Sequence, residues 1–118
     1  MSEGRLRQAM LLDFYGELLT ERQRVCFDLH YNEDLSLSEI AEQCGISRQG
    51  VWDNIRRAES AMEDIEEKTG LIRRFEENRS ALEKIREDMK TLAAITGGQA
   101  HETAVKAMEE IGNLIARG

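Results

Sequence analysis

The segment from Ser47 to Arg57 carries the side chains best suited to contact another molecule. Six of its eleven residues are candidate contacts: Ser47, Arg48, Gln49, Trp52, Arg56 and Arg57. Arginine and glutamine donate hydrogen bonds to base edges and phosphate oxygens, and an indole ring can stack on a base. Three arginines oppose one acid, Asp53, so the local charge between residues 47 and 58 is about +2. This combination indicates a small surface for double-stranded DNA.

A helix must position these side chains, because the apolar residues that follow Ser47 recur at helical spacing. Their steps are 4, 3, 4 and 3, and they are Val51, Ile55, Ala58, Met62 and Ile65. Ser47 can cap the first turn of this helix. If the apolar stripe is buried, helical geometry turns Arg48, Gln49, Trp52 and Arg56 to the outer face.

A second, shorter helix is expected immediately before it. The run Ser36-Leu37-Ser38-Glu39 has the form of a capping box, and Gly45 is a natural left-handed stop. Ala41 supplies the small residue needed where two helices cross. Apolar residues that would lock the crossing angle are Ile40, Cys44, Ile46, Val51 and Ile55. Residues 36–58 therefore predict a helix-turn-helix motif, in which the N-terminal part of the second helix meets the major groove.

Each candidate contact has a second interpretation. Trp52 either contacts DNA or packs against a neighbouring helix, and Ser47 is a helix cap before it is a phosphate contact. Arg56 and Arg57 either touch phosphate or pair with acids within helical reach. Those acids are Asp53, Glu59 and Glu63.

Two helices are expected upstream of the motif. The first ends near Leu19, and its apolar stripe, which needs a partner to pack against, is Leu6, Met10, Leu11, Phe14 and Leu18. The second starts at Thr20, because Thr20 and Gln23 form a capping box, and it turns Val25, Cys26 and Leu29 inward.

The character of the sequence changes after Thr69-Gly70. Apolar residues then alternate at steps of 4 and 3 around a single polar member: Leu71, Phe75, Asn78, Leu82, Ile85, Met89 and Leu92. Such a heptad pattern either packs back on the first domain or forms a dimer. Gly97-Gly98 breaks this helix, and Ala104, Met108, Ile111 and Ile115 outline a last amphipathic helix.

We therefore expect an all-α chain in three parts. Residues 1–68 form the helix-turn-helix domain, residues 69–96 form a heptad-patterned helix that packs on it or dimerises, and residues 97–118 form a terminal amphipathic helix. The absence of proline and an aromatic content of 5% agree with a helical chain.

Composition limits the function classes. The 118 residues carry a net charge of −7, all of it from residues 1–70, which hold 8 basic and 15 acidic side chains. This excess opposes strong non-specific binding to nucleic acid. Signatures of common enzymes, metal sites and cofactor sites are missing, so we expect no enzyme, metal or cofactor. Neither a signal peptide nor a membrane span is expected, so we expect the protein to be cytoplasmic. Cys26 and Cys44 are interpreted as reduced core residues.

Several runs resemble known bacterial proteins. Leu19–Val25, Leu35–Glu42, Ile46–Gln49 and Val51–Ala58 resemble sigma-factor region 4. Leu12–Thr20 and Ser47–Arg57 resemble more closely the YlxM family of bacterial helix-turn-helix proteins. The resemblance covers roughly residues 10–95 and implies an all-helical fold, with Gly50 standing where the family usually has a helix-favouring residue such as Ala. Genes of that family typically lie beside those of the signal recognition particle GTPase or its receptor, which implies a regulatory part in that pathway.

The sequence thus yields two functional hypotheses. The first is a cytoplasmic DNA-binding regulatory protein that uses Ser47 to Arg57, acts in the signal recognition particle pathway and contacts components of it. A homodimer would present two recognition helices to half-sites about 34 Å apart. The second is an acidic adaptor that keeps the helix-turn-helix fold and docks on a basic protein or ribonucleoprotein without binding DNA.

Overall fold

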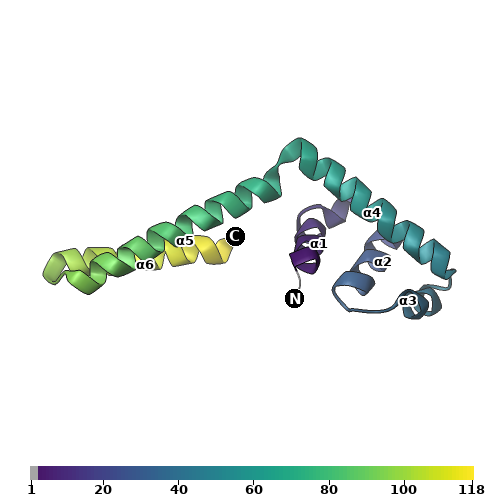
Figure 1. The fold of residues 1–118 in the computed structure, drawn as a ribbon, viewed down its shortest axis with the longest axis horizontal. Helices are drawn as coiled ribbons and strands as arrows, with labels where there is room; N and C mark the ends of the chain where they lie inside the picture. Colours follow the sequence, from purple (N-terminus) through teal and green to yellow (C-terminus); the bar gives the residue numbers. More distant parts are fainter. Residues whose placement is uncertain (1–2) are drawn as a thin grey trace. The chain divides into compact units, whose positions relative to one another are not determined.

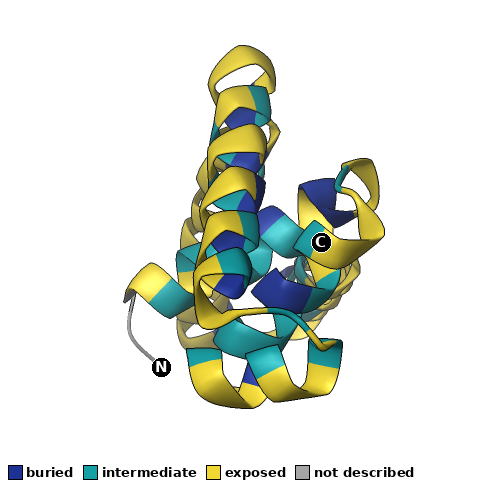
Figure 2. Cartoon of the chain, turned by 90° about the vertical axis from the view of Figure 1, so that its right-hand side faces the viewer, coloured by how far each residue is buried: buried dark blue, intermediate teal, exposed yellow. Residues whose placement is uncertain are grey.

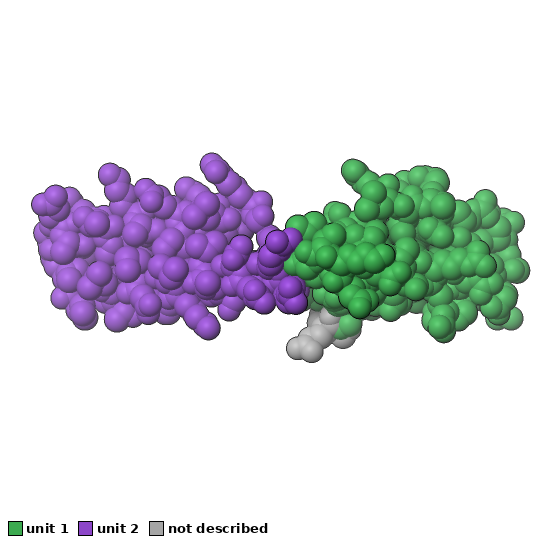
Figure 3. Space-filling view, turned by 90° about the horizontal axis from the view of Figure 1, so that it is seen from above, with its two compact units in different colours: residues 1–72 green, residues 73–118 purple. Residues whose placement is uncertain are grey.

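The computed structural model describes residues 3–118, and within that range the chain is helical with short connections and no strand (Figure 1). The elements in chain order are α1 (Glu3–Tyr15), the 3₁₀ helix η1 (Gly16–Leu18), α2 (Glu21–Tyr31), α3 (Leu37–Cys44), α4 (Arg48–Thr69), α5 (Leu71–Ile95) and α6 (Gly98–Arg117). The prediction of an all-α fold is confirmed. These residues form two compact units, residues 1–72 and residues 73–118 (Figure 3).

Local capping interactions explain where α2 and α3 begin. The Thr20 hydroxyl accepts from the backbone N–H of Gln23, and the Gln23 side chain accepts from the backbone N–H of Thr20, each at 3.2 Å. Ser36 and Glu39 make the same reciprocal pair at 3.1 Å. Each pair satisfies two N–H groups that lack partners inside the helix. Both predicted capping boxes are confirmed.

The first unit encloses a core between α1, α2, α3 and α4. Its largest fully buried side chains are Phe27, Leu11, Ile40, Ile55, Met62, Ile72, Val51 and Cys26. Along α4 the buried positions recur on one side of the helix, and most of the remaining surface is exposed (Figure 2). The apolar stripe predicted from Val51 to Met62 is therefore the inner face of α4, with Ile65 partly buried at its end.

The prediction for the inner face of α1 is wrong in part. Leu6, Phe14 and Leu18 are 55%, 39% and 71% exposed, whereas Leu11 and Tyr15 are buried. The Tyr15 hydroxyl donates to the Glu66 carboxylate at 2.6 Å, and Thr69 Oγ1 lies 2.7 Å from the same hydroxyl. These contacts with the end of α4 turn Tyr15 inward, so the neighbouring Phe14 faces outward.

Glu66 is the one buried charged residue of the described chain, at 7% exposed. Besides Tyr15, the backbone N–H of Ile72 donates to its carboxylate at 2.9 Å, which ties the end of α4 to the first turn of α5. Gly70 between them has a φ of 62°, a left-handed conformation that glycine adopts without strain. Burial, followed by the hydrogen bond to Glu66, raises the pKa of Tyr15.

The cysteines carry no disulfide. Cys26 is buried and Cys44 is half-buried in the same core. Burial raises the pKa of Cys26, and the adjacent Cys44 thiol raises it further. Cys26 is therefore held as a neutral thiol, and both cysteines pack as small apolar residues of the core.

The second unit is a hairpin of α5 and α6. Nδ1 of His101 lies 2.7 Å from the carbonyl oxygen of Ala93, next to the connection. Further along, a Cβ on Gly112 would contact the Arg86 guanidinium, and one on Gly118 would contact the Phe75 ring. The two helices therefore run side by side in opposite directions (Figure 1). The predicted break at Gly97-Gly98 is confirmed.

Candidate nucleic-acid interface

The turn between α3 and α4 has the geometry that a helix-turn-helix motif requires. Gly45 has φ 68° and ψ 34°, and its N–H donates to the Ala41 carbonyl at 2.9 Å. The N–H of Ile46 donates to the same carbonyl at 3.2 Å. Ser47 then caps α4, because its hydroxyl accepts from the N–H of Gly50 at 3.0 Å. The predicted stop at Gly45 and the predicted cap at Ser47 are both confirmed.

Gly50 fits closely against this cap. A Cβ at Gly50 would lie 3.2 Å from Ser47 Oγ and 3.6 Å from Cδ1 of Ile46. Glycine inside a helix costs about 1 kcal/mol relative to alanine. An alanine at position 50 would recover less than this amount of helix stability, because its Cβ would force the Ser47 hydroxyl to move.

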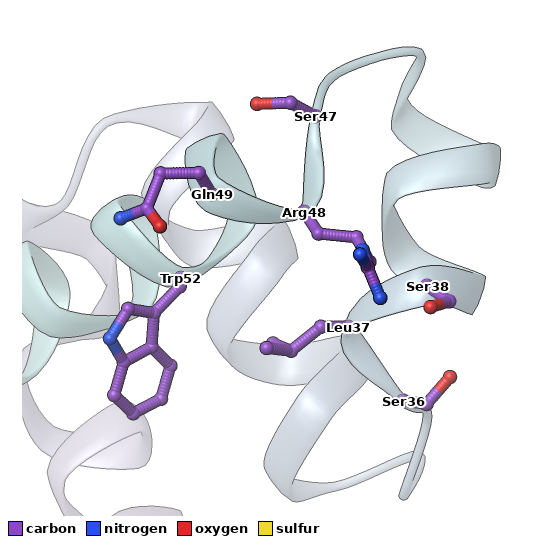
Figure 4. A pocket seen from close by; sticks show the side chains of 7 residues that line it. All are labelled: Ser36, Leu37, Ser38, Ser47, Arg48, Gln49 and Trp52. Carbon is purple, nitrogen blue, oxygen red and sulfur yellow. The ribbon is translucent and has the colours of Figure 1, made fainter.

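The first turns of α3 and α4 border an open hollow of about 660 Å³ (Figure 4). Its lining residues are Ser36, Leu37, Ser38, Ser47, Arg48, Gln49 and Trp52. In Figure 4 the Arg48 side chain extends toward the first turn of α3, and Leu37 lies between it and the Trp52 ring. The hollow therefore lies beside the N-termini of two helices, whose partial positive charge favours anions.

All six predicted contact residues are exposed, and four of them, Ser47, Arg48, Gln49 and Trp52, line this hollow. Trp52 is 38% exposed, and the Arg56 guanidinium lies 5.8 Å from the centroid of its ring. Arg56 therefore joins the group through a cation–π contact. Arg57 is exposed but does not line the hollow.

The acids that could have neutralised Arg56 and Arg57 have other partners. Asp53 accepts from the Gln49 amide at 2.9 Å, and Glu59 accepts from the Gln8 amide at 3.2 Å. Glu63 pairs with Arg7 at 3.1 Å. Within residues 3–118, neither Arg56 nor Arg57 forms an ion pair.

Glu59 has a further neighbour in the core. Burial raises the pKa of Tyr31, and the Glu59 carboxylate next to it raises that pKa again. Glu59 therefore has neighbours on both α1 and α2, in Gln8 and Tyr31, and forms no ion pair with the arginines of its own helix. The sequence alone does not reveal this, because the partners are far apart along the chain.

Sequence reasoning did not place Ser36, Leu37 and Ser38 at the site. The sequence does contain a signal for these residues. The Ser36 capping box marks the N-terminus of α3, and a helix-turn-helix motif places that N-terminus beside the N-terminus of α4.

Other kinds of site are not found in the part of the chain that the structure describes. No group of three or more His, Cys, Asp or Glu side chains is arranged to hold a metal ion. None of the described helices has the length and apolar character needed to cross a membrane.

The turn, the capped second helix and its exposed polar face define a helix-turn-helix protein. The family described as "Putative helix-turn-helix protein, YlxM / p13 like" matches residues 2–100. The chain belongs to this family, UPF0122. The resemblance recognised in the sequence is thereby confirmed.

Relatives in the family match most of the chain. A UPF0122 protein of Thermoanaerobacter sp. strain X514 is 43% identical over 111 residues, which cover 94% of this chain and 92% of the relative. One of Acetivibrio thermocellus is 43% identical over 102 residues, covering 86% and 87% of the two chains. One of Geobacillus kaustophilus is 48% identical over 87 residues, covering 74% and 79%.

Proposed function

We propose that the chain is a regulatory protein that binds double-stranded DNA through the outer face of α4. The observation that carries the proposal is the engagement of Asp53, Glu59 and Glu63 by Gln49, Gln8 and Arg7. These contacts leave Arg56 and Arg57 without a carboxylate partner on an exposed face. Phosphate groups are the ligands that such arginines bind well.

The residues of the face have different proposed roles. Arg48 and Gln49, in the first turn of α4, contact base edges, because recognition helices contact bases with their N-terminal residues. Arg56 and Arg57 contact phosphate, and Ser47 fixes the start of the helix. Trp52 supports Arg56 through their 5.8 Å contact and lies where it can meet the DNA surface.

We further propose that the chain acts in the cytoplasm as a homodimer. Its proposed role is binding, without catalysis. Residues 1–70 carry 8 basic against 15 acidic side chains, so one copy gains little from long-range attraction to DNA. Two copies would present two recognition helices to half-sites about 34 Å apart. The gene context of the YlxM-like relatives suggests the signal recognition particle pathway, whose components are proposed as further partners.

Fluorescence anisotropy of labelled nucleic acids tests this proposal. The full chain is titrated into a mixed-sequence DNA duplex and, separately, into signal recognition particle RNA, from low to physiological salt. We expect duplex binding that weakens steeply with salt, and a smaller salt slope for Arg48→Ala/Arg56→Ala, because fewer counterions are released.

A matched control removes the same charge from the other unit. Arg79→Ala/Lys90→Ala also lowers the net charge by two, but both residues belong to α5. This variant should bind the duplex like the wild type. Equal losses in both double variants would mean that only net charge matters and would remove the α4 face from the proposal.

A second function remains, because the acidic excess of residues 1–70 favours a basic partner. In this alternative the fold serves as an adaptor for a basic protein or ribonucleoprotein. Binding would then depend on the exposed glutamates and persist in Arg48→Ala/Arg56→Ala. Absence of duplex binding even at low salt would favour the adaptor over the DNA-binding protein.

A further inference from the structure

The hairpin of α5 and α6 has almost no interior of its own. Between residues 73 and 118 the only buried side chains are Ala93 and Ala104, at 9% and 2% exposed. Larger apolar side chains stay open to solvent, including Ile95 and Leu114 at 75% and 51%. So small a unit rarely supplies enough buried apolar area to hold its helices together, and oligomerisation is one of the usual remedies.

The heptad pattern of α5 divides into two rows with different environments. The row Phe75, Leu82 and Met89 is half-buried. The row Asn78, Ile85 and Leu92 is exposed, with Ile85 at 46% and Leu92 at 41%. Members of each row are seven residues apart, so each row runs along one line of the helix. One row is partly covered, and the other is left open.

We propose that a second copy of this chain covers the exposed row. Two hairpins then pack as a four-helix bundle across a two-fold axis, with Ile85 and Leu92 at the interface and Asn78 as its polar member. A polar residue in such a seam fixes register and partner number at some loss of stability. Isologous contacts of this kind are the commonest way in which identical chains associate.

Charge favours a second copy over a strongly charged partner. Residues 73–118 contain eight basic and eight acidic side chains, so two hairpins meet without net repulsion. Some of these charges are paired along α5 itself, as in Arg79 with Glu83 at 3.3 Å. In contrast, residues 1–72 contribute the full charge of −7, which makes that unit a poor surface for self-association.

This interface deepens the homodimer of the proposed function and rests on that part of it, but it concerns residues 73–118 alone and does not rest on DNA binding. Its test therefore uses no nucleic acid. Sedimentation equilibrium of the full chain, from low micromolar to submillimolar concentration, measures the mass directly. We expect a monomer–dimer equilibrium that approaches twice the chain mass of 13.5 kDa. A wild type that stays monomeric throughout would overturn the proposal. A monomer is also the result expected if another part of the same chain covers the exposed row.

Charged substitutions in the row should weaken the dimer. Ile85→Glu/Leu92→Glu places two carboxylates per chain in the interface, and we expect the dissociation constant to rise by roughly tenfold or more. Ser80→Glu/Ala94→Glu adds the same charge on the opposite side of α5, at exposed positions. This control should dimerise like the wild type. Equal weakening in both variants would contradict the assigned row.

A second variant is designed to strengthen association, because the charged variant could lose its dimer simply by unfolding. Asn78→Leu completes the apolar row and should tighten association or raise its order, because the seam loses its polar member. Ser80→Leu adds the same side chain away from the row and should change nothing. Equal behaviour of Asn78→Leu and the wild type, with circular dichroism showing unchanged helix content, would also overturn the proposal.

Discussion

The two units of the chain use similar helical patterns but bury very different amounts of apolar surface. In residues 1–72 four helices surround fully buried side chains as large as Phe27, whereas in residues 73–118 two helices bury only two alanines. A hairpin leaves each helix open on most sides, so even a regular heptad pattern cannot form a closed core. Amphipathic spacing therefore predicts a helix, while the number of helices around it decides whether its apolar face is covered.

Truncation of the largest core side chain should give the largest effect. Phe27→Ala leaves a cavity in the first unit and should lower its free energy of unfolding by about 3–5 kcal/mol. Urea denaturation followed by the fluorescence of Trp52, the only tryptophan, measures this unit. Leu82→Ala in the second unit should leave the Trp52 transition unchanged. A shift of similar size in both variants would show that the two units do not differ in this way.

Loss of the buried carboxylate should have the next largest effect. Glu66→Ala leaves the Tyr15 hydroxyl and the Ile72 N–H without the acceptor that lies 2.6 and 2.9 Å away. Buried polar groups that lose a partner cost about 1–3 kcal/mol. The same Trp52 assay should show a loss in this range, against no more than about 0.5 kcal/mol for the exposed neighbour in Glu67→Ala. Equal stability of Glu66→Ala and Glu67→Ala would deny Glu66 its structural role.

High pH should weaken the first unit by a smaller amount, because both tyrosines belong to it. The pKa of Tyr15 is raised above its usual value of about 10, so its folded state holds the proton more tightly than its unfolded state. That stability is fully present below pH 10 and is lost as pH rises through the raised pKa. The advantage of the wild type over Tyr15→Phe, measured by urea denaturation at several pH values, should therefore be constant up to about pH 9 and shrink above pH 10. An advantage that grows with pH would contradict the burial of a neutral Tyr15.

Local features of the motif could be predicted from the sequence because their partners are close along the chain. The Thr20–Gln23 and Ser36–Glu39 boxes each close within three residues, and Gly45 needs only its own lack of a side chain. The exposed position of Arg48 and Gln49 followed from the spacing of Val51 and Ile55 in the same helix. For such features residue type and spacing contain the necessary information.

Long-range partners decided the rest. Spacing alone favoured Phe14 and Leu18 as core residues, but Tyr15 is buried instead because its hydroxyl meets Glu66, 51 positions away. Likewise, only the folded chain brings Arg7 and Gln8 to Glu63 and Glu59, which gives both acids hydrogen-bond partners other than Arg56 and Arg57.

Residue types and their spacing were enough to place the helices, their caps, the turn at Gly45 and the polar outer face of α4, since helical periodicity and capping are short-range effects. The tertiary structure decided which apolar stripe of α1 is buried and which side chains pair with the acids of α4. It also decided which row of α5 is covered by α6. These outcomes depend on hydrogen bonds and packing between residues tens of positions apart, which periodicity along a single helix does not encode.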